Sequence, residues 1–175
     1  MSPGDPSRRP KIAALVASCL ASCALWTQAR SEEPGPLPLS VEALDGREVV
    51  LRPGAPALHV VFFATWCPPC MDEMRDLADL ESRWVGRGYR LALVAVPSRQ
   101  TRERLGAFVK ESSPPGEVLF DQSGSATRAA GAERLPLHLV LDAKGAVVAR
   151  SGNIADGVDA AVARLLGGPR RGERR

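Results

Sequence analysis

Apolar residues in the middle of this chain form short continuous runs separated by a helical stripe. The run 59–64 is rich in β-branched and aromatic residues, which is typical of a buried strand, and the run 91–96 predicts a second one. Between the runs, apolar residues recur at steps of three and four and predict a helix that ends near Arg87. The residues expected on its inner face are Met74, Leu77, Ala78 and Trp84.

Turn signals predict two hairpins around this strand–helix–strand unit. Asp45-Gly46 separates the apolar segments 41–44 and 49–51, and a second turn separates the segments 137–141 and 146–150. The other expected elements are a helix capped by Ser98, a strand at 118–120, a short helix at 125–130 and an amphipathic helix at 158–166. Periodicity therefore indicates a mixed α/β protein.

Composition predicts one globular domain, because the chain has 175 residues, of which 45% are hydrophobic and 25% charged. Residues 1–29 are not expected to belong to this globular domain. Three basic residues precede an apolar run at 12–26 and small residues at 27–29, which is the pattern of a signal peptide or a membrane or lipid anchor. The domain organisation expected is this leader, a linker at 30–38, the domain at 39–168 and a basic tail at 169–175.

Three fates of the leader remain open. Cleavage after Ala29 would release the domain, whereas Leu20-Ala21-Ser22-Cys23 resembles a lipobox in which Cys23 carries lipid, with Cys19 in a weaker match. An uncleaved anchor is the third fate, although the apolar run is shorter than the roughly 20 residues that span a bilayer. Each fate predicts an extracytoplasmic protein, in the periplasm or cell envelope, where disulfides persist.

The charge balance argues against nucleic-acid binding. The chain has 23 basic and 20 acidic residues, and removing the leader takes away three basic residues and one acidic residue. The rest is nearly neutral, and four of its arginines lie in the tail. Because a nucleic-acid surface needs a basic stripe, no nucleic-acid partner is expected.

Cys67 and Cys70 carry the candidate chemistry, since they are two residues apart where the strand meets the predicted helix. Unpaired N–H groups at a helix N-terminus stabilise a thiolate, so we expect a lowered pKa for Cys67. Cys70, one turn inward, would then attack the mixed disulfide formed by Cys67. The intervening Pro68-Pro69 is compatible with the first helical turn, whose N–H groups have no intrahelical partner.

Two structural interpretations compete with redox chemistry. A structural disulfide over so short a loop would remove little entropy from the unfolded chain. A zinc site needs four ligands, and outside the leader the only cysteines and histidines are Cys67, Cys70, His59 and His138. Because His59 lies at the far end of the strand from Cys67, no metal is expected, and no other cofactor is expected either.

The segment 62–74 resembles the active-site segment of thioredoxin-like proteins, most closely the membrane-tethered, extracytoplasmic TlpA/ResA-like disulfide reductases. A second matching segment comprises Gly131 and 135–145, and the resemblance spans roughly 39–166. It implies a thioredoxin fold, with a central mixed β-sheet flanked by helices and an N-terminal β-hairpin extension. It also implies an exported thiol–disulfide oxidoreductase, in particular a protein disulfide reductase that acts, for example, in cytochrome c maturation.

The resemblance also implies roles for individual residues. Cys67 is the nucleophile and Cys70 the resolving thiol, while Pro136 is expected to follow a cis bond and to face them. The backbone of Leu135 would pair with an extended substrate. Trp66 would present an apolar surface to the partner. The expected partners are proteins with disulfides or thiols, a membrane electron-donor protein, and the membrane itself through the N-terminal segment or a lipid.

Departures from the family pattern leave alternatives open. Val61 stands where many relatives carry a buried Asp or Asn, and Leu137 where they carry Thr or Ser. Glu73 resembles an acidic position of the family but also fits a solvated helix charge, and His138 either points to the site or is a strand histidine without a role. A thiol peroxidase, a disulfide-forming oxidase or isomerase, and a non-catalytic client-binding module are the alternative functions.

Overall fold

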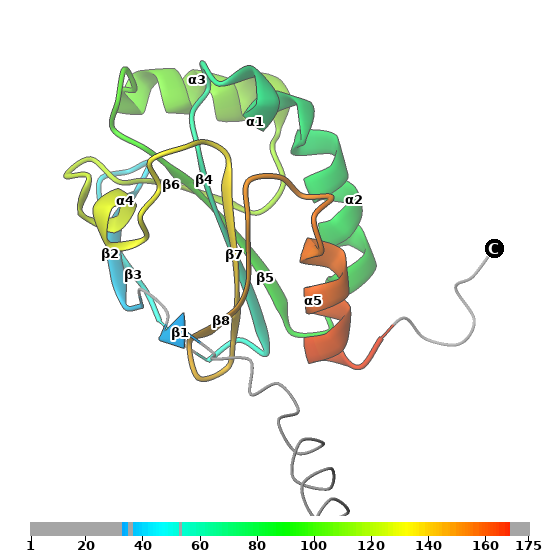
Figure 1. Cartoon of the computed structure of the whole chain (residues 1–175). Helices are drawn as coiled ribbons and strands as arrows, with labels where there is room; N and C mark the ends of the chain where they lie inside the picture. The colour runs from blue at the N-terminus through cyan, green and yellow to red at the C-terminus, as the bar shows by residue number, and fades with distance from the viewer. Residues whose placement is uncertain (1–32, 35–36, 53, 169–175) are drawn as a thin grey trace, which may run out of the picture. The chain divides into compact units, whose positions relative to one another are not determined.

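The computed structural model of the protein describes residues 33–34, 37–52 and 54–168. The predicted leader at 1–29, including Cys23, and the predicted tail at 169–175 lie outside the described residues. Eight strands form one mixed sheet in the order β1-β8-β7-β4-β5-β6-β2-β3 (Figure 1). They are β1 (Glu33–Pro34), β2 (Leu39–Ala43), β3 (Glu48–Leu51), β4 (Ala57–Phe63), β5 (Tyr89–Ala95), β6 (Glu117–Phe120), β7 (Leu137–Asp142) and β8 (Ala146–Ser151).

Five helices connect and cover the strands, with α2 and α5 together on one side of the sheet and α4 on the other (Figure 1). They are α1 (Pro68–Asp72), α2 (Met74–Trp84), α3 (Arg102–Ser112), α4 (Ser125–Ala129) and α5 (Val158–Leu166). The helices α1 and α2 connect the parallel strands β4 and β5, and α3 connects the parallel strands β5 and β6. The order β4-β5-β6 means that both connections move along the sheet in the same direction. Because such crossovers are right-handed, α2 and α3 lie on the same face of the sheet.

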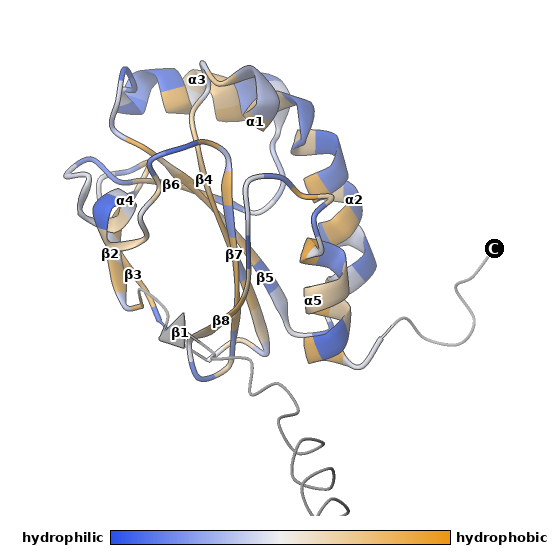
Figure 2. Ribbon diagram, viewed as in Figure 1, coloured by the Kyte–Doolittle hydropathy of each residue, from blue (hydrophilic) through white to orange (hydrophobic). Residues whose placement is uncertain are grey.

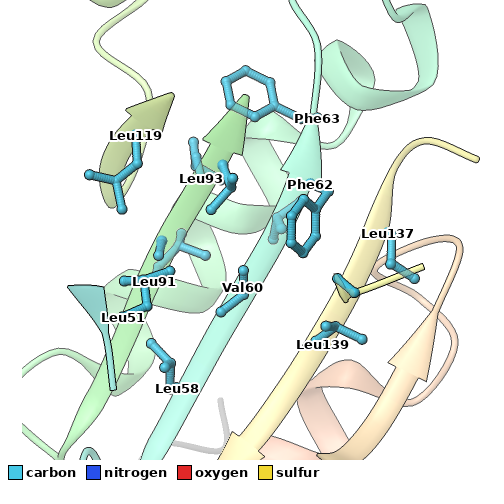
Figure 3. Packing of buried hydrophobic residues seen from close by; sticks show 14 of the residues in the cluster. Leu51, Leu58, Val60, Phe62, Phe63, Leu91, Leu93, Leu119, Leu137 and Leu139 are labelled. Atoms are coloured by element: carbon cyan, nitrogen blue, oxygen red, sulfur yellow. The ribbon is translucent and has the colours of Figure 1, made fainter. Parts of the chain in front are cut away.

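The core lies along the central strands β4, β5 and β7. All seven residues of β4 are buried, as expected of a strand that is covered on both faces. Apolar colouring concentrates on these strands and on the inward sides of the helices (Figure 2). Side chains of β4, such as Val60 and Phe62, pack beside Leu139 and Leu137 of β7 (Figure 3).

Both predicted hairpins are present. β2 and β3 pair antiparallel around the Asp45-Gly46 turn, and β7 and β8 pair antiparallel. The N-terminal hairpin extends the sheet beyond β6, because Glu42 and Ala43 of β2 pair with Phe120 and Leu119. The predicted central mixed sheet with flanking helices and an N-terminal hairpin is therefore confirmed.

The predicted helix through Arg87 differs from the structure in two ways. It is interrupted at Glu73, whose backbone N–H bonds to the carbonyl of Met71, so that α1 and α2 are separate elements. Ala78 is exposed, and the inner face of α2 is formed by Leu77, Leu80 and Trp84. The inward stripe therefore runs along a slightly different side of the helix than the pattern predicted.

Two other element boundaries differ from the sequence-based expectation. Helix α3 begins after Thr101, whose side chain accepts a hydrogen bond from the backbone N–H of Arg104, so Ser98 is not its cap. Within the predicted linker 30–38, Glu33–Pro34 forms the short strand β1, which pairs with β8. The unpaired edge of β8 offers backbone groups that such a segment can satisfy.

Across the described residues, none of the helices combines the length and apolar character needed to traverse a bilayer.

Candidate functional site

Cys67 and Cys70 lie where β4 meets α1, as predicted, and they form a disulfide with their Cα atoms 5.3 Å apart. Cys67 occupies the N-cap position, and its Sγ accepts a hydrogen bond from the backbone N–H of Cys70 at 3.4 Å. Pro68 and Pro69 begin the helix, where a missing N–H costs no intrahelical bond. The exposed fractions are 5% for Cys67 and 2% for Cys70, so Cys67 is the more accessible residue of the two.

A mostly apolar pocket of about 500 Å³ opens beside Cys67. Trp66, Cys67 and Leu135 all contribute to its lining, together with Val96, Pro97 and Ala132. The structure thus brings three of the predicted site residues together at one cavity, although Leu135 is far from the cysteines in sequence.

Pro136 follows Leu135 through a cis peptide bond, as the resemblance implied. It immediately precedes β7, whose first residue Leu137 pairs with Phe62 near the end of β4. Because β4 and β7 are antiparallel neighbours, the start of β7 and the segment after β4 lie at the same edge of the sheet. Pro136 is therefore at the same end of the sheet as the dithiol.

Trp66 is partly exposed, with 38% of its surface accessible, whereas Trp84 is buried as predicted. The indole Nε1–H of Trp66 donates to the carbonyl of Ser98 at 2.7 Å. The guanidinium of Arg99 lies 4.1 Å from the centroid of the indole ring and makes a cation–π contact. The sequence pattern gave no indication of the contact with Arg99, because the two residues come from different loops.

A chain of buried polar groups on the face of the sheet that carries α2 and α5 was not predicted. The hydroxyl of Tyr89 lies 2.8 Å from Nδ1 of His59, and Nε2 of His59 lies 3.0 Å from Nδ1 of His138. Nε2 of His138 lies 2.8 Å from Oε2 of Glu73, whose Oε1 accepts from the backbone N–H of Ile154 at 3.0 Å. The prediction of a solvated charge at Glu73 is therefore wrong, and both ring nitrogens of His138 have partners.

Burial governs the charge of the two histidines. It lowers the pKa of His59 well below its ordinary value, and His138 lowers it further. Burial also lowers the pKa of His138, although the neighbouring Glu73 acts in the opposite direction. Burial raises the pKa of the Tyr89 hydroxyl. Both rings are therefore neutral at pH 7, and Tyr89 keeps its proton.

Among residues 33–34, 37–52 and 54–168, no group of three or more His, Cys, Asp and Glu side chains is arranged to hold a metal ion. Cys67 and Cys70 are bonded to each other, and His59 and His138 point to Tyr89 and Glu73.

Comparisons with known proteins agree with this geometry. The sequence model of the Redoxin family matches residues 30–163. The thiol-disulfide oxidoreductases ResA of Bacillus thuringiensis and Bacillus cereus are each 26% identical over 109 residues. These matches cover 62% of this chain and 62% of each relative, so they span less than two thirds of the relatives' length.

Solved structures share the fold. A thiol:disulfide interchange protein of the thioredoxin family from Chlorobium tepidum is 28% identical, with a TM-score of 0.62, over 77% of this chain and 97% of its own. A putative interchange protein DsbE from Chlorobium tepidum has a TM-score of 0.65 at 19% identity, over 74% of this chain and 93% of its own. StoA from Bacillus subtilis has a TM-score of 0.61 at 17% identity, over 73% of this chain and 98% of its own.

The predicted thioredoxin fold and the resemblance to TlpA/ResA-like proteins are thus confirmed, and the match over residues 30–163 shows that the chain belongs to the Redoxin family.

Proposed function

We propose that this protein is a thiol–disulfide oxidoreductase that exchanges electrons with protein disulfides through Cys67 and Cys70. The observation that carries the proposal is the Cys67–Cys70 disulfide at the N-terminus of α1, with Cys67 lining an apolar pocket. A purely structural bond of this loop length would add little stability. The relatives named thiol-disulfide oxidoreductase support the same activity.

The reaction begins from the reduced pair. The thiolate of Cys67 attacks one sulfur of a client disulfide, so that the client S–S bond breaks, a Cys67–client bond forms, and the other client sulfur leaves as a thiolate. Cys70 then attacks the sulfur of Cys67 and gives up its proton, and the second client thiolate leaves. The client gains two electrons, and the protein ends in the disulfide state of this structure.

Trp66, Leu135 and Pro136 serve in this proposal as substrate-binding residues. The exposed indole and the pocket beside Cys67 favour an apolar client segment. The backbone of Leu135, at the rim of the same pocket, is available to pair with an extended client strand.

Net reduction in an extracytoplasmic compartment is the direction that we propose, for example towards the disulfides of apocytochrome c. The signal-like leader at 1–29 supports export, by cleavage, lipidation or anchoring. A dithiol in such a compartment must be reduced again after each turnover, so a membrane electron-donor protein is the expected partner. Since no histidine separates the cysteines, we expect a potential between the roughly −120 mV of DsbA and the roughly −270 mV of thioredoxin.

Disulfide exchange with a client tests the proposal. The reduced wild-type protein, mixed with insulin, should generate client thiols and become oxidised at Cys67 and Cys70. Cys70→Ser should accumulate a mixed disulfide on Cys67, because the resolving thiol is missing, and mass spectrometry of the tryptic peptides would locate it. Cys67→Ser is the matched control and should trap no client.

Four outcomes would overturn the proposal. A wild-type protein that forms no client thiols is not a reductase, and one that only oxidises client dithiols works in the opposite direction. Rapid consumption of hydrogen peroxide with a sulfenic acid on Cys67 would identify a thiol peroxidase. A non-catalytic client-binding module would retain full client binding in both serine variants.

A further inference from the structure

Every ring nitrogen of the two fully buried histidines has one hydrogen-bond partner. The contacts form a hydrogen-bonded chain in the order Tyr89, His59, His138, Glu73. A neutral imidazole has one donor nitrogen and one acceptor nitrogen. Since Nε2 of His59 faces Nδ1 of His138, only one of these two atoms can carry a proton. The two rings must therefore have the same tautomer, both Nε2–H or both Nδ1–H.

The charge of Glu73 selects between the two tautomers. An ionised carboxylate only accepts, so it requires a proton on Nε2 of His138, which in turn requires Nε2–H on His59 and a donating Tyr89 hydroxyl. A Glu73 protonated on Oε2 donates to His138 and requires the opposite tautomer of both rings. The Ile154 N–H donates to the other carboxylate oxygen and holds the side chain in place.

The hydrogen-bonded chain ends at Glu73, which is close to the reactive pair in the sequence. Glu73 follows Cys70 by three residues at the end of α1, and neighbours at this spacing share one helix face. His138 pairs across the strands with Val61, six residues before Cys67, and follows Pro136 by two residues. The exposed fraction of the Glu73 side chain is only 15%, so water screens its charge less than it would that of an exposed carboxylate.

The titratable groups around the chain come from three other elements. Tyr89 belongs to β5, and the charged groups that act on it are Glu81 and Arg83 of α2 and Asp159 of α5. These groups lie at the tyrosine end of the chain. At the opposite end, the carboxylate of Glu73 contacts the ring of His138.

We propose that His138 and His59 are positioning residues for thiol–disulfide exchange, which act through Glu73 by switching tautomer together whenever this carboxylate gains or loses a proton. The inference rests on the proposed function. When the switch occurs, the Nε2 proton of His138 passes to Glu73, and the Nε2 proton of His59 passes to Nδ1 of His138. The hydroxyl proton of Tyr89 passes to Nδ1 of His59, and Tyr89 takes one proton from water. Each ring then holds one proton on Nδ1, and the network has gained one proton in total.

The consequence for the dithiol is electrostatic. An ionised Glu73 disfavours a thiolate on Cys70, whereas a neutral Glu73 does not. The N–H of His138 partly compensates the negative charge and fixes its place, while His59 fixes the tautomer of His138. The pair thereby sets the pH at which Cys70 can act as a nucleophile.

Nitrogen-15 NMR of the histidine rings tests the tautomers directly in the full-length disulfide form. We expect both rings to be Nε2–H at pH 7 and, on acidification, to switch to Nδ1–H at one shared pH. Opposite tautomers in the two rings, or one ring that becomes a cation while the other is unchanged, would overturn the inference. This measurement does not depend on any client activity.

The midpoint potential of the Cys67–Cys70 couple against glutathione, followed with pH, tests the link to the dithiol. The quantity compared is the break in the potential–pH curve, which is the pH at which the slope of the curve changes. His138→Leu removes the N–H donor and leaves the Glu73 charge uncompensated, so this break should move up by about one pH unit. His138→Gln keeps a donor for Glu73 and an acceptor for His59, and it should restore the wild-type break. Ser151→Ala, at the position paired with His138 on β8, is the matched control and should leave it unchanged.

The outcomes separate the two proposals. An active wild type together with a folded His138→Leu variant that has an unshifted or lowered break would refute only the positioning role. A wild type that exchanges no disulfides would refute the proposed function, whatever the tautomers show. If His138→Leu does not fold, the NMR result and the His138→Gln curve still decide the inference, because an altered break in the glutamine variant contradicts it.

Discussion

At the scale of single residues, the most informative feature is that two histidines lie in the core without an unpaired ring nitrogen. Burying an unpartnered polar group costs about 1–3 kcal/mol, so His59 and His138 are tolerated because Tyr89, Glu73 and each other supply the partners. Burial lowers the pKa of both rings and so keeps them neutral in the folded protein. Acidification must therefore oppose folding.

The stability of the disulfide form should depend on pH through these rings. Their pKa values are lowered in the folded state, so the unfolded chain binds protons first as the pH falls below about 6.5, and stability decreases. The loss should approach about 1.4 kcal/mol per pH unit for each histidine that titrates only when unfolded. Urea unfolding between pH 7.5 and pH 5 measures the slope, with the double variant His59→Leu, His138→Leu as the comparison. A flat wild-type curve, or an equal slope in the variant, would contradict the prediction.

At the scale of elements, tight connections hold the helices against the sheet. Gly116 joins α3 to β6 with a φ of +67°, and a Cβ atom there would lie 2.7 Å from Cγ and 2.8 Å from the carbonyl oxygen of Leu91. The position thus requires glycine both for its backbone conformation and for the close approach of β5. Gly106, inside α3, has no such neighbour within 4 Å.

These two glycines should respond oppositely to alanine. Gly116→Ala should lower the free energy of unfolding by at least about 2 kcal/mol, because it combines a left-handed backbone with a clash. Gly106→Ala should raise it by about 0.5–1 kcal/mol, because alanine is the better helix former. Chemical denaturation of both variants measures the difference. Equal effects of the two substitutions would show that the loop can move away from Leu91.

At the scale of the whole molecule, the sheet order is what assembles the site. β7 pairs with β4 although 73 residues separate Pro136 from the end of β4 at Phe63, and this pairing brings the Pro136 segment to the cysteines. A compact unit begins at Glu32, and the described core belongs entirely to it. Folding of this unit should therefore not require the leader.

A chain that begins at residue 30 should fold like the full-length protein. It retains β1 and every described core residue, so its free energy of unfolding should differ by no more than about 0.5 kcal/mol. Urea unfolding of both chains, followed by tryptophan fluorescence, provides the test. A destabilisation of more than about 1 kcal/mol, or a loss of cooperative unfolding, would mean that the leader contributes to the fold.

The predicted elements were largely correct because the local signals were strong. Continuous apolar runs identified β4 and β5, and turn residues such as Asp45-Gly46 identified the hairpins, since these depend on neighbours in sequence. The interruption at Glu73 and the exposure of Ala78 were missed. Helical periodicity does not show where a side chain is held by contacts to a distant strand and loop, as Glu73 is by His138 and Ile154.

The sequence by itself determined the dithiol, since Cys67 and Cys70 are close in the chain and their spacing places both at the start of one helix. Only the tertiary structure decided the partners of the buried polar groups. The contact between His59 and His138 depends on the pairing of β4 with β7 and on which face each residue occupies. Because a shift of one residue in strand register would turn His138 to the other face, no pattern along the chain could reveal that it lies between His59 and Glu73.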